Sequence, residues 1–228
     1  MELKFIGNGS GFNKTNNSAF FTLENDLYII DISMLNMNRI KILFDFNSYN
    51  NIYIIITHMH ADHVSGIPNI IDYLYYIFDI KVNLVVPTNL KKDIITLNEI
   101  CGVSKEQYNI IDSKDLKVIK ETIKTKHSNT LKNGCFGYLF DINNKNILYT
   151  GDTANLDAFE KYFNIVHELY VDVNYNGQKV HVNFHKFIKN LPKCKKIYLM
   201  HLDEEDKIRN EIKNLDNVFI AEIYKGEK

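Results

Sequence analysis

Cysteine, proline and glycine are all scarce in this sequence, and each shortage excludes a class of protein. The chain of 228 residues contains 3 Cys, 3 Pro and 10 Gly. So little proline and glycine rules out collagen-like and low-complexity sequences. The three cysteines, Cys101, Cys135 and Cys194, are an odd number and form no Cys-x-x-Cys pair, so we expect no disulfide framework. This cysteine usage fits a reducing compartment.

Long hydrophobic runs are also missing. The longest, such as residues 52–56 and 73–78, are far shorter than the roughly 20 residues that a membrane-spanning helix needs. The opening segment MELKFIGNGSGF lacks the apolar stretch of a signal peptide. We therefore expect a soluble protein of the cytoplasm.

The chain carries no excess of charge of either sign. It has 27 Lys and Arg against 28 Asp and Glu, which gives a formal net charge of −1. No overall field would attract nucleic acid. Hydrophobic residues make up 45% and charged residues 24%, which is typical of a globular protein with a sizeable core. We expect one domain over residues 1–228.

Short β-branched and aromatic runs, separated by Gly, Asn and Ser, predict many strands in two successive groups. The expected strands are 3–6, 18–23, 27–32, 52–57, 82–86, 116–126, 135–142, 146–149, 169–173, 195–200 and 218–223. The expected helices are 68–78, 88–101, 156–163 and 203–215. Two groups of strands with interspersed helices predict two sheets packed face to face, in a four-layer αββα sandwich of the α/β class.

A dense cluster of metal-ligand residue types follows the apolar strand expected at 52–57. Residues 58–63 read His-Met-His-Ala-Asp-His, although the whole chain has only 8 His. An ordinary polar loop would not concentrate three of them within six positions. His58 and His60 are two apart in extended backbone and would point to the same side. Asp62 and His63 follow as the chain turns, where they could reach a second metal ion.

Imidazole and carboxylate ligands suit zinc, manganese or iron. Two coordination spheres need further ligands, and three candidates stand at the ends of later strands. These are His127, Asp152 and His201. Polar residues at the carboxyl ends of strands commonly form ligand sites in α/β sheets. Each of the three alone would more often be a structural residue than a ligand, but the six-residue motif reverses that expectation.

The segment HMHADH resembles the HxHxDH signature of the metallo-β-lactamase fold superfamily. The run from Phe5 to Gly11 resembles the opening strand and glycine turn of the ribonuclease Z-like branch. Asp31-Ile32-Ser33 resembles the first motif, which usually reads Asp-Cys-Gly, and Ser65 to Pro68 resembles the segment after the histidine motif. His127, Gly151-Asp152-Thr153 and His201 match the later motifs.

The resemblance implies a dinuclear centre, with zinc as the expected metal. One ion would be held by His58, His60 and His127, the other by Asp62, His63 and His201, with Asp152 between them. Two such ions would lower the pKa of a shared water, and Asp62 could also orient that water.

The same branch pairs an acidic residue at a strand end with a downstream histidine that assists departure of the leaving group. Asp172 and His181 resemble this pair, although the acid stands in Val171-Asp172-Val173 rather than the usual His-Glu-Ala. His185 is the competing choice for the general acid. His167 has no motif around it and is expected to be structural.

Several substrates remain open. Many members of the ribonuclease Z-like branch that process tRNA carry a protruding Gly/Pro-rich arm, and no such insertion is visible between His63 and His127. Armless relatives include cyclic-nucleotide phosphodiesterases, some of them phage proteins that destroy cyclic pyrimidine nucleotide signals. We therefore expect a phosphodiesterase for a cyclic nucleotide, acting as a homodimer. The alternatives are an endonuclease for RNA 3′ ends and a protein that binds a nucleotide or metal without turnover.

Overall fold

The computed structural model describes residues 2–226, and two β-sheets are built from two successive halves of the chain. Position 1 and positions 227–228 lie outside this described part. The first sheet has the order β1 (Lys4–Gly7), β2 (Ser18–Leu23), β3 (Asp26–Ile30), β4 (Ile52–Ile55), β5 (Val82–Val86), β6 (Tyr108–Asp112). The strands β1 to β3 pair antiparallel, and β3 to β6 pair parallel.

The second sheet follows the same plan: its strands lie side by side in chain order, the first two pairings are antiparallel and the others are parallel. Its main strands are β7 (Ile119–Thr125), β8 (Cys135–Ile142), β9 (Lys145–Tyr149), β10 (Glu168–Asn174), β12 (Lys196–Met200) and β13 (Val218–Ile220). The order is β13-β12-β10-β9-β8-β7, and the short β11 (Val182–Asn183) pairs with the end of β10. The β8–β9 hairpin turns at Asn143 and Asn144, which both have positive φ, as the Asn-Asn sequence predicts.

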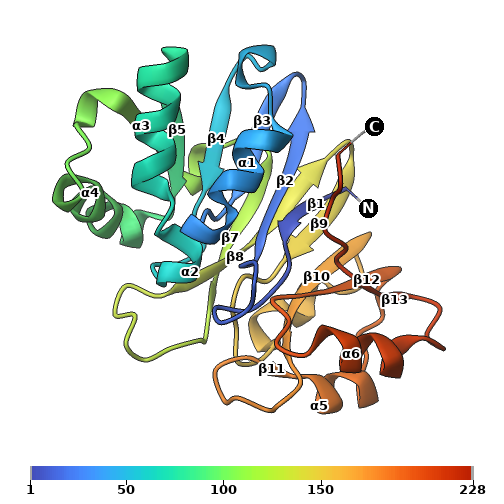
Figure 1. Cartoon of the computed structure of the whole chain (residues 1–228). Coiled ribbons are helices and arrows are strands. Elements are labelled where there is room, and N and C mark those ends of the chain that lie inside the picture. The colour runs from blue at the N-terminus through green and yellow to red at the C-terminus, as the bar shows by residue number, and fades with distance from the viewer. Residues whose placement is uncertain (1, 227–228) are drawn as a thin grey trace.

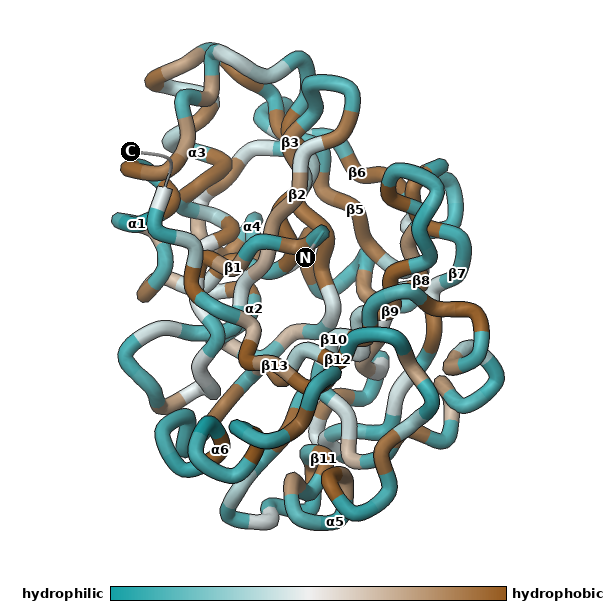
Figure 2. Tube along the Cα trace, turned by 90° about the vertical axis from the view of Figure 1, so that its right-hand side faces the viewer, coloured by the Kyte–Doolittle hydropathy of each residue, from teal (hydrophilic) through white to brown (hydrophobic). Residues whose placement is uncertain are grey.

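Helices cover the outer face of each sheet. The helices α1 (Met37–Leu43), α3 (Ile67–Phe78) and α4 (Lys91–Ile100) pack on the first sheet, and α5 (Phe184–Lys189) and α6 (Glu205–Ile212) pack on the second (Figure 1). The inner faces of the two sheets share one apolar core, with Phe5, Tyr28 and Ile55 on one side and Tyr138 and Tyr170 on the other. Figure 2 shows hydrophobic colour on central strands such as β5 and on α3, whereas β7 and α6 are mostly hydrophilic. The expected four-layer αββα sandwich is confirmed.

The carboxyl ends of the central strands meet at one edge of the sandwich. Because β7 and β9 both run antiparallel to β8, they point the same way, and β10 and β12 run parallel to β9. Hydrogen bonds tie the two sheets together here, from Phe136 N to Thr57 O at 3.0 Å and from Ser10 N to Leu202 O at 2.9 Å. The loops that leave these strand ends therefore form one continuous site.

Some elements differ from the sequence-based expectation. The strand β6 was not anticipated, because it is the last strand of its sheet and only partly buried, so its sequence shows little apolar patterning. The helix α1 has no side-chain N-cap hydrogen bond and no acidic residue in its first turn; Met37 and Ile40 hold it by burial. The helix expected at 156–163 is a 3₁₀ helix, η6 (Asp157–Tyr162).

Candidate metal centre

Seven side chains converge at this edge in two sets, and they come from the four segments that follow β4, β7, β9 and β12. The first set contains His58, His60, His127 and Asp152, and the second contains Asp62, His63 and His201. Within each set, the candidate ligand atoms lie within 4.8 Å of one another. The short helix α2 (Ala61–Val64) begins directly after His60, and this turn separates the two halves of the histidine motif. The structure thus brings together all seven residues that the sequence singled out.

Three imidazole nitrogens of the first set point at one another. The Nδ1 atom of His60 lies 3.1 Å from Nε2 of His58 and 3.2 Å from Nε2 of His127. These separations are close to the ~3.3 Å between nitrogens that bind one zinc tetrahedrally at 2.0–2.1 Å. The spacing of this set therefore fits a shared cation.

Hydrogen bonds on the far side of the rings fix which nitrogen carries the proton. Nδ1 of His127 donates to the carbonyl of Val180 at 2.7 Å. Nδ1 of His58 lies 3.0 Å from the Thr57 hydroxyl, which gives its own proton to Asp31, so this Nδ1 must be the donor. In neutral rings with this tautomer, the Nε2 atoms of His58 and His127 carry the lone pairs, and both lie beside Nδ1 of His60. A metal ion would satisfy all three.

Asp152 lies between the two sets. Its Oδ2 atom is 3.7 Å from Nε2 of His127 and 3.8 Å from Nε2 of His58. On the other side, the same oxygen is 3.5 Å from Nε2 of His63 and 3.3 Å from Nε2 of His201. Within the described residues, Oδ1 of Asp152 and Nε2 of His63 are buried and have no hydrogen-bond partner. Buried polar atoms without partners are costly, and metal coordination would satisfy them.

Asp31 orients His63 of the second set. The sequence predicted no role for this residue beyond its resemblance to a motif. Its Oδ2 accepts a hydrogen bond from Nδ1 of His63 at 2.8 Å and one from the Thr57 hydroxyl at 2.6 Å. Its Oδ1 accepts from the Thr57 main-chain N–H at 2.9 Å. A carboxylate behind a ligand histidine fixes the ring and raises its basicity. No sequence signal marked Thr57 or the Val180 carbonyl.

The acids and imidazoles shift one another's pKa values. Burial alone would lower the pKa of His63, but Asp152 and Asp31 raise it well above its ordinary value. Burial likewise opposes protonation of His201, and Asp152, Asp172 and Asp62 raise its pKa to about 10. Although burial favours the neutral acid, His201 and His63 hold the pKa of Asp152 well below its usual range. The acidic side chains thus create a strongly negative environment, and a bound cation would replace the protons on these rings.

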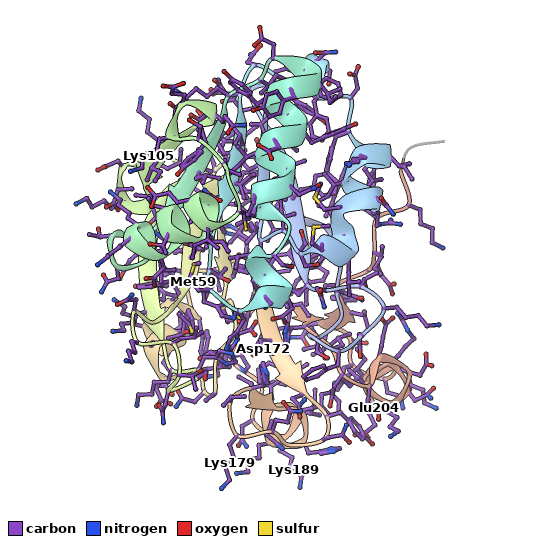
Figure 3. The ribbon with its side chains drawn as sticks, turned by 60° about the vertical axis from the view of Figure 1, so that its left-hand side comes forward. Met59, Lys105, Asp172, Lys179, Lys189 and Glu204 are labelled. Atoms are coloured by element: carbon purple, nitrogen blue, oxygen red, sulfur yellow. The ribbon has the colours of Figure 1, made fainter. Side chains whose placement is uncertain are left out.

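A second acid–histidine pair stands beside the metal set. Nδ1 of His181 donates to Oδ2 of Asp172 at 2.8 Å, and the same oxygen accepts from Thr153 N at 3.0 Å. Burial would lower the pKa of His181, but the Asp172 carboxylate raises it above its ordinary value. Figure 3 shows Asp172 near the middle of the molecule, below α2, at the end of β10. Oδ1 of Asp172 also lies 3.3 Å from Nδ1 of His201, so this acid contacts both rings.

Five residues of the two sets and His181 line a cavity of about 380 Å³, the five being His60, Asp62, His127, Asp152 and His201. Its walls also include Phe12 from the loop after β1, Ser128 after His127, and Asn174 and Gln178 near the end of β10. This volume is at the lower end of the range for small-molecule sites.

The two other histidines lie elsewhere. The His185 side chain is 44% exposed, and its Nδ1 lies 3.7 Å from Glu211 Oε2 on α6. His167 precedes β10 at its amino end, where its Nδ1 accepts a hydrogen bond from Asn146 N at 3.1 Å. Neither lines the cavity, whereas His181 does.

One family model matches almost the whole chain. It is described as "Anti-Pycsar protein Apyc1", and residues 1–222 match it. No protein among the curated sequences matches significantly.

Solved structures of similar fold span nearly the full chain. The metallo-β-lactamase fold protein YhfI from Bacillus subtilis is 17% identical with a TM-score of 0.77, covering 96% of this chain and 95% of its own. The short form of human tRNase Z is 15% identical with a TM-score of 0.68, covering 98% and 97%. A diphosphatase of the PhnP family is 15% identical with a TM-score of 0.70, covering 97% and 94%. At these identities the likeness shows the metallo-β-lactamase fold.

Proposed function

The chain belongs to the family of the anti-Pycsar protein Apyc1, and from this premise we propose that it is a dinuclear metal-dependent phosphodiesterase that hydrolyses a cyclic nucleotide. The observation that carries the proposal is the position of Asp152. Its carboxylate lies within 4 Å of imidazoles from both candidate metal sets, beside a cavity that also contains a hydrogen-bonded acid–histidine pair.

The residues present fit two divalent ions, of which zinc is the expected one. His58, His60 and His127 would hold one ion and Asp62, His63 and His201 the other, with Asp152 shared. When bound, two such ions lower the pKa of water and offset charge on a phosphoryl group. Around them, Asp31 and the Val180 carbonyl orient ligand rings, and Asp62, at the cavity wall, is placed to accept a proton from an attacking water.

The proton for the leaving group would come from His181. Its Nδ1 is committed to Asp172, so Nε2 is the nitrogen available to a substrate in the cavity. Cleavage of a phosphodiester forms one P–O bond to water and breaks one P–O bond to the leaving alkoxide. Protonated His181 gives its Nε2 proton to that alkoxide oxygen, which avoids release of a strongly basic anion. The raised pKa of His181 keeps a larger fraction of the ring protonated near neutral pH.

A small substrate agrees with the size and charge of the protein. A cavity of about 380 Å³ suits a mononucleotide, and the net charge of −1 provides no general attraction for a polyanion. Residues 64–126, where a tRNA-binding arm would be inserted, are occupied by α3, β5, α4, β6 and β7. A pyrimidine cyclic nucleotide is the first choice, because the chain belongs to the family of an anti-Pycsar protein.

Chromatography of reaction products tests the proposal. Zinc- or manganese-loaded protein is incubated separately with 3′,5′-cyclic mononucleotides, cyclic dinucleotides and precursor tRNA. Ring opening of a cyclic mononucleotide, lost in Asp152→Ala, is the expected result. Trimming of the tRNA with all cyclic nucleotides intact would instead identify an RNA 3′-end endonuclease. Tight binding of a nucleotide without any product would identify a non-catalytic binder.

Assembly and location belong to the same proposal. We expect a homodimer, which light scattering on the purified protein can test. Among residues 2–226 no helix is long and apolar enough to cross a membrane. We expect the protein to act in the cytoplasm, where its nucleotide substrate would be found.

A further inference from the structure

Phe12 stands at the rim of the cavity, and its side chain is almost entirely in solvent. It is 98% exposed, the highest value among the large hydrophobic residues that the structure describes as exposed. A phenylalanine ring gains about 1.5–3 kcal/mol when it is buried, so an aromatic ring left in water favours a partner. Because Phe12 lines the same cavity as the candidate metal ligands, that partner can be a ligand held in the cavity.

The backbone that carries this ring is firmly held. Ser10 N and the Asn13 side-chain amide both donate to the carbonyl of Leu202, at 2.9 Å and 2.6 Å. Asn13 N donates to Ser10 O at 3.0 Å, and the Asn16 side chain donates to the same oxygen at 3.1 Å. Leu202 directly follows His201, so the loop is fixed to the strand end that supplies a metal-site residue. A ring on such a loop is presented at a defined place.

Gly11 sets the distance between the ring and the metal centre. A Cβ atom at this position would lie 2.8 Å from Oδ2 of Asp62, so the glycine allows the backbone to lie directly against that carboxylate. Phe12 is the next residue, one Cα step of about 3.8 Å away. If the phosphoryl group of a substrate lies among the candidate metal ligands, the group attached to that phosphate would therefore lie near Phe12.

We propose that the ring of Phe12 is the stacking platform for the nucleobase of the substrate, a specificity element of the proposed phosphodiesterase site. The proposal rests on the proposed function, because it requires a phosphate-bearing substrate in this cavity. Bases stack on aromatic side chains through their π faces, which does not require base-specific hydrogen bonds. Asn174 and Gln178 line the same cavity and would offer polar groups to a bound nucleotide.

The test compares two substrates that differ only in the base. Initial rates are measured for cyclic 3′,5′-CMP and for base-free ribose 3′,5′-cyclic phosphate, with the metal-loaded wild type, Phe12→Ala and Phe12→Trp. Ile100→Ala is the control, since Ile100 is another exposed apolar residue and lies outside the cavity wall. Phe12→Ala should raise KM for the nucleotide by about 5- to 150-fold, which is the range for loss of one stacked base. KM for the base-free ester should not change, and Phe12→Trp should retain nucleotide affinity.

Other outcomes overturn the proposal in recognisable ways. An equal loss on both substrates, or no loss on the nucleotide, removes the stacking role. If sedimentation shows that Phe12→Ala also changes the oligomeric state, the ring contacts a second copy of the chain instead of the base. If wild-type protein cleaves neither ester, the proposed function fails. The stacking proposal is then decided separately by equilibrium dialysis with cyclic CMP, where Phe12→Ala should raise Kd by the same factor.

Discussion

The carboxylate of Asp172 lies 2.8 Å from Nδ1 of His181, and this contact decides which nitrogen of the ring is available to a substrate. Asp172 is fully buried and is also held by the Thr153 N–H, so the ring is oriented by a fixed group. Nε2 is left for the cavity that His181 lines. The arrangement resembles the orientation of a catalytic histidine by a buried acid in other hydrolases.

Replacement of His181 by alanine should impair cleavage according to the leaving group. With an alkyl phosphodiester, whose leaving group is strongly basic, kcat should fall by about 10²–10⁴-fold because the proton donor is lost. With bis-(p-nitrophenyl) phosphate the fall should be much smaller, since p-nitrophenolate leaves without a proton. His185→Ala is the matched control and should leave both rates near wild type, because His185 lies outside the cavity wall. Equal losses on both esters would exclude a general acid.

Replacement of Asp31 by alanine should weaken metal binding although Asp31 belongs to neither ligand set. The change removes the acceptor for Nδ1 of His63 and for both Thr57 donors, and loss of such an outer partner typically costs 10–100-fold in metal affinity. Competition with a chromogenic chelator measures the zinc Kd. Asp216→Ala, at an exposed position, serves as control. An unchanged Kd in Asp31→Ala would show that the contact does not support the metal.

Removal of bound metal should destabilise the folded protein. At a free metal concentration 1,000 times Kd, binding to the native state contributes about 4 kcal/mol. For a chain of 228 residues this corresponds to a Tm change of roughly 8–16 °C. Calorimetry with and without a chelator measures the difference. The Tm of Asp152→Ala should change little when the chelator is added. An equally unchanged Tm in the wild type would argue against a bound metal.

Asp112 should stabilise the fold in a pH-dependent way. It is only 6% exposed and accepts hydrogen bonds from Thr88 Oγ1 at 2.6 Å and Lys114 N at 3.2 Å, and Lys91 Nζ lies 2.9 Å away. Burial alone would raise its pKa, but these partners lower the pKa below its usual value. The pKa of the Asp112 carboxyl is lower in the folded protein than in the unfolded chain, where it is about 3.9. The stabilisation is therefore fully present above a pH of about 3.9 and is lost as the pH falls through the pKa of the folded protein.

In Asp112→Asn, the free energy of unfolding should therefore be lower by about 1.5–3 kcal/mol at pH 7, the usual contribution of hydrogen bonds to a charged group. Urea titrations at pH 7 and at a pH below the folded pKa compare the variant with wild type. The difference should shrink at the acidic pH, where the wild-type carboxyl is also neutral. A gap of the same size at both pH values would show that charge is not involved.

The sequence by itself determined the fold class and the seven residues of the candidate metal centre. Alternation and apolar runs reveal buried strands, because the residues that pack in a core must be apolar, and β4 and β12 were evident for this reason. The short spacing from His58 to His63 made that half of the site visible, since four polar residues in six positions need no tertiary information to be noticed. Elements held by few buried side chains, such as α1 and β6, were not evident.

Tertiary structure alone decided how the side chains meet. His127, Asp152 and His201 are far apart in the chain, and only the shared direction of β7, β9 and β12 brings their loops to one edge. The choice of His181 over His185 depended on the tertiary fold, which places the loop before β11 at the cavity wall and leaves His185 on α5 outside it. The exposure of Phe12 at the cavity rim has no sequence signal at all. Distances between residues remote in the chain are set by packing and strand order, which local sequence patterns do not encode.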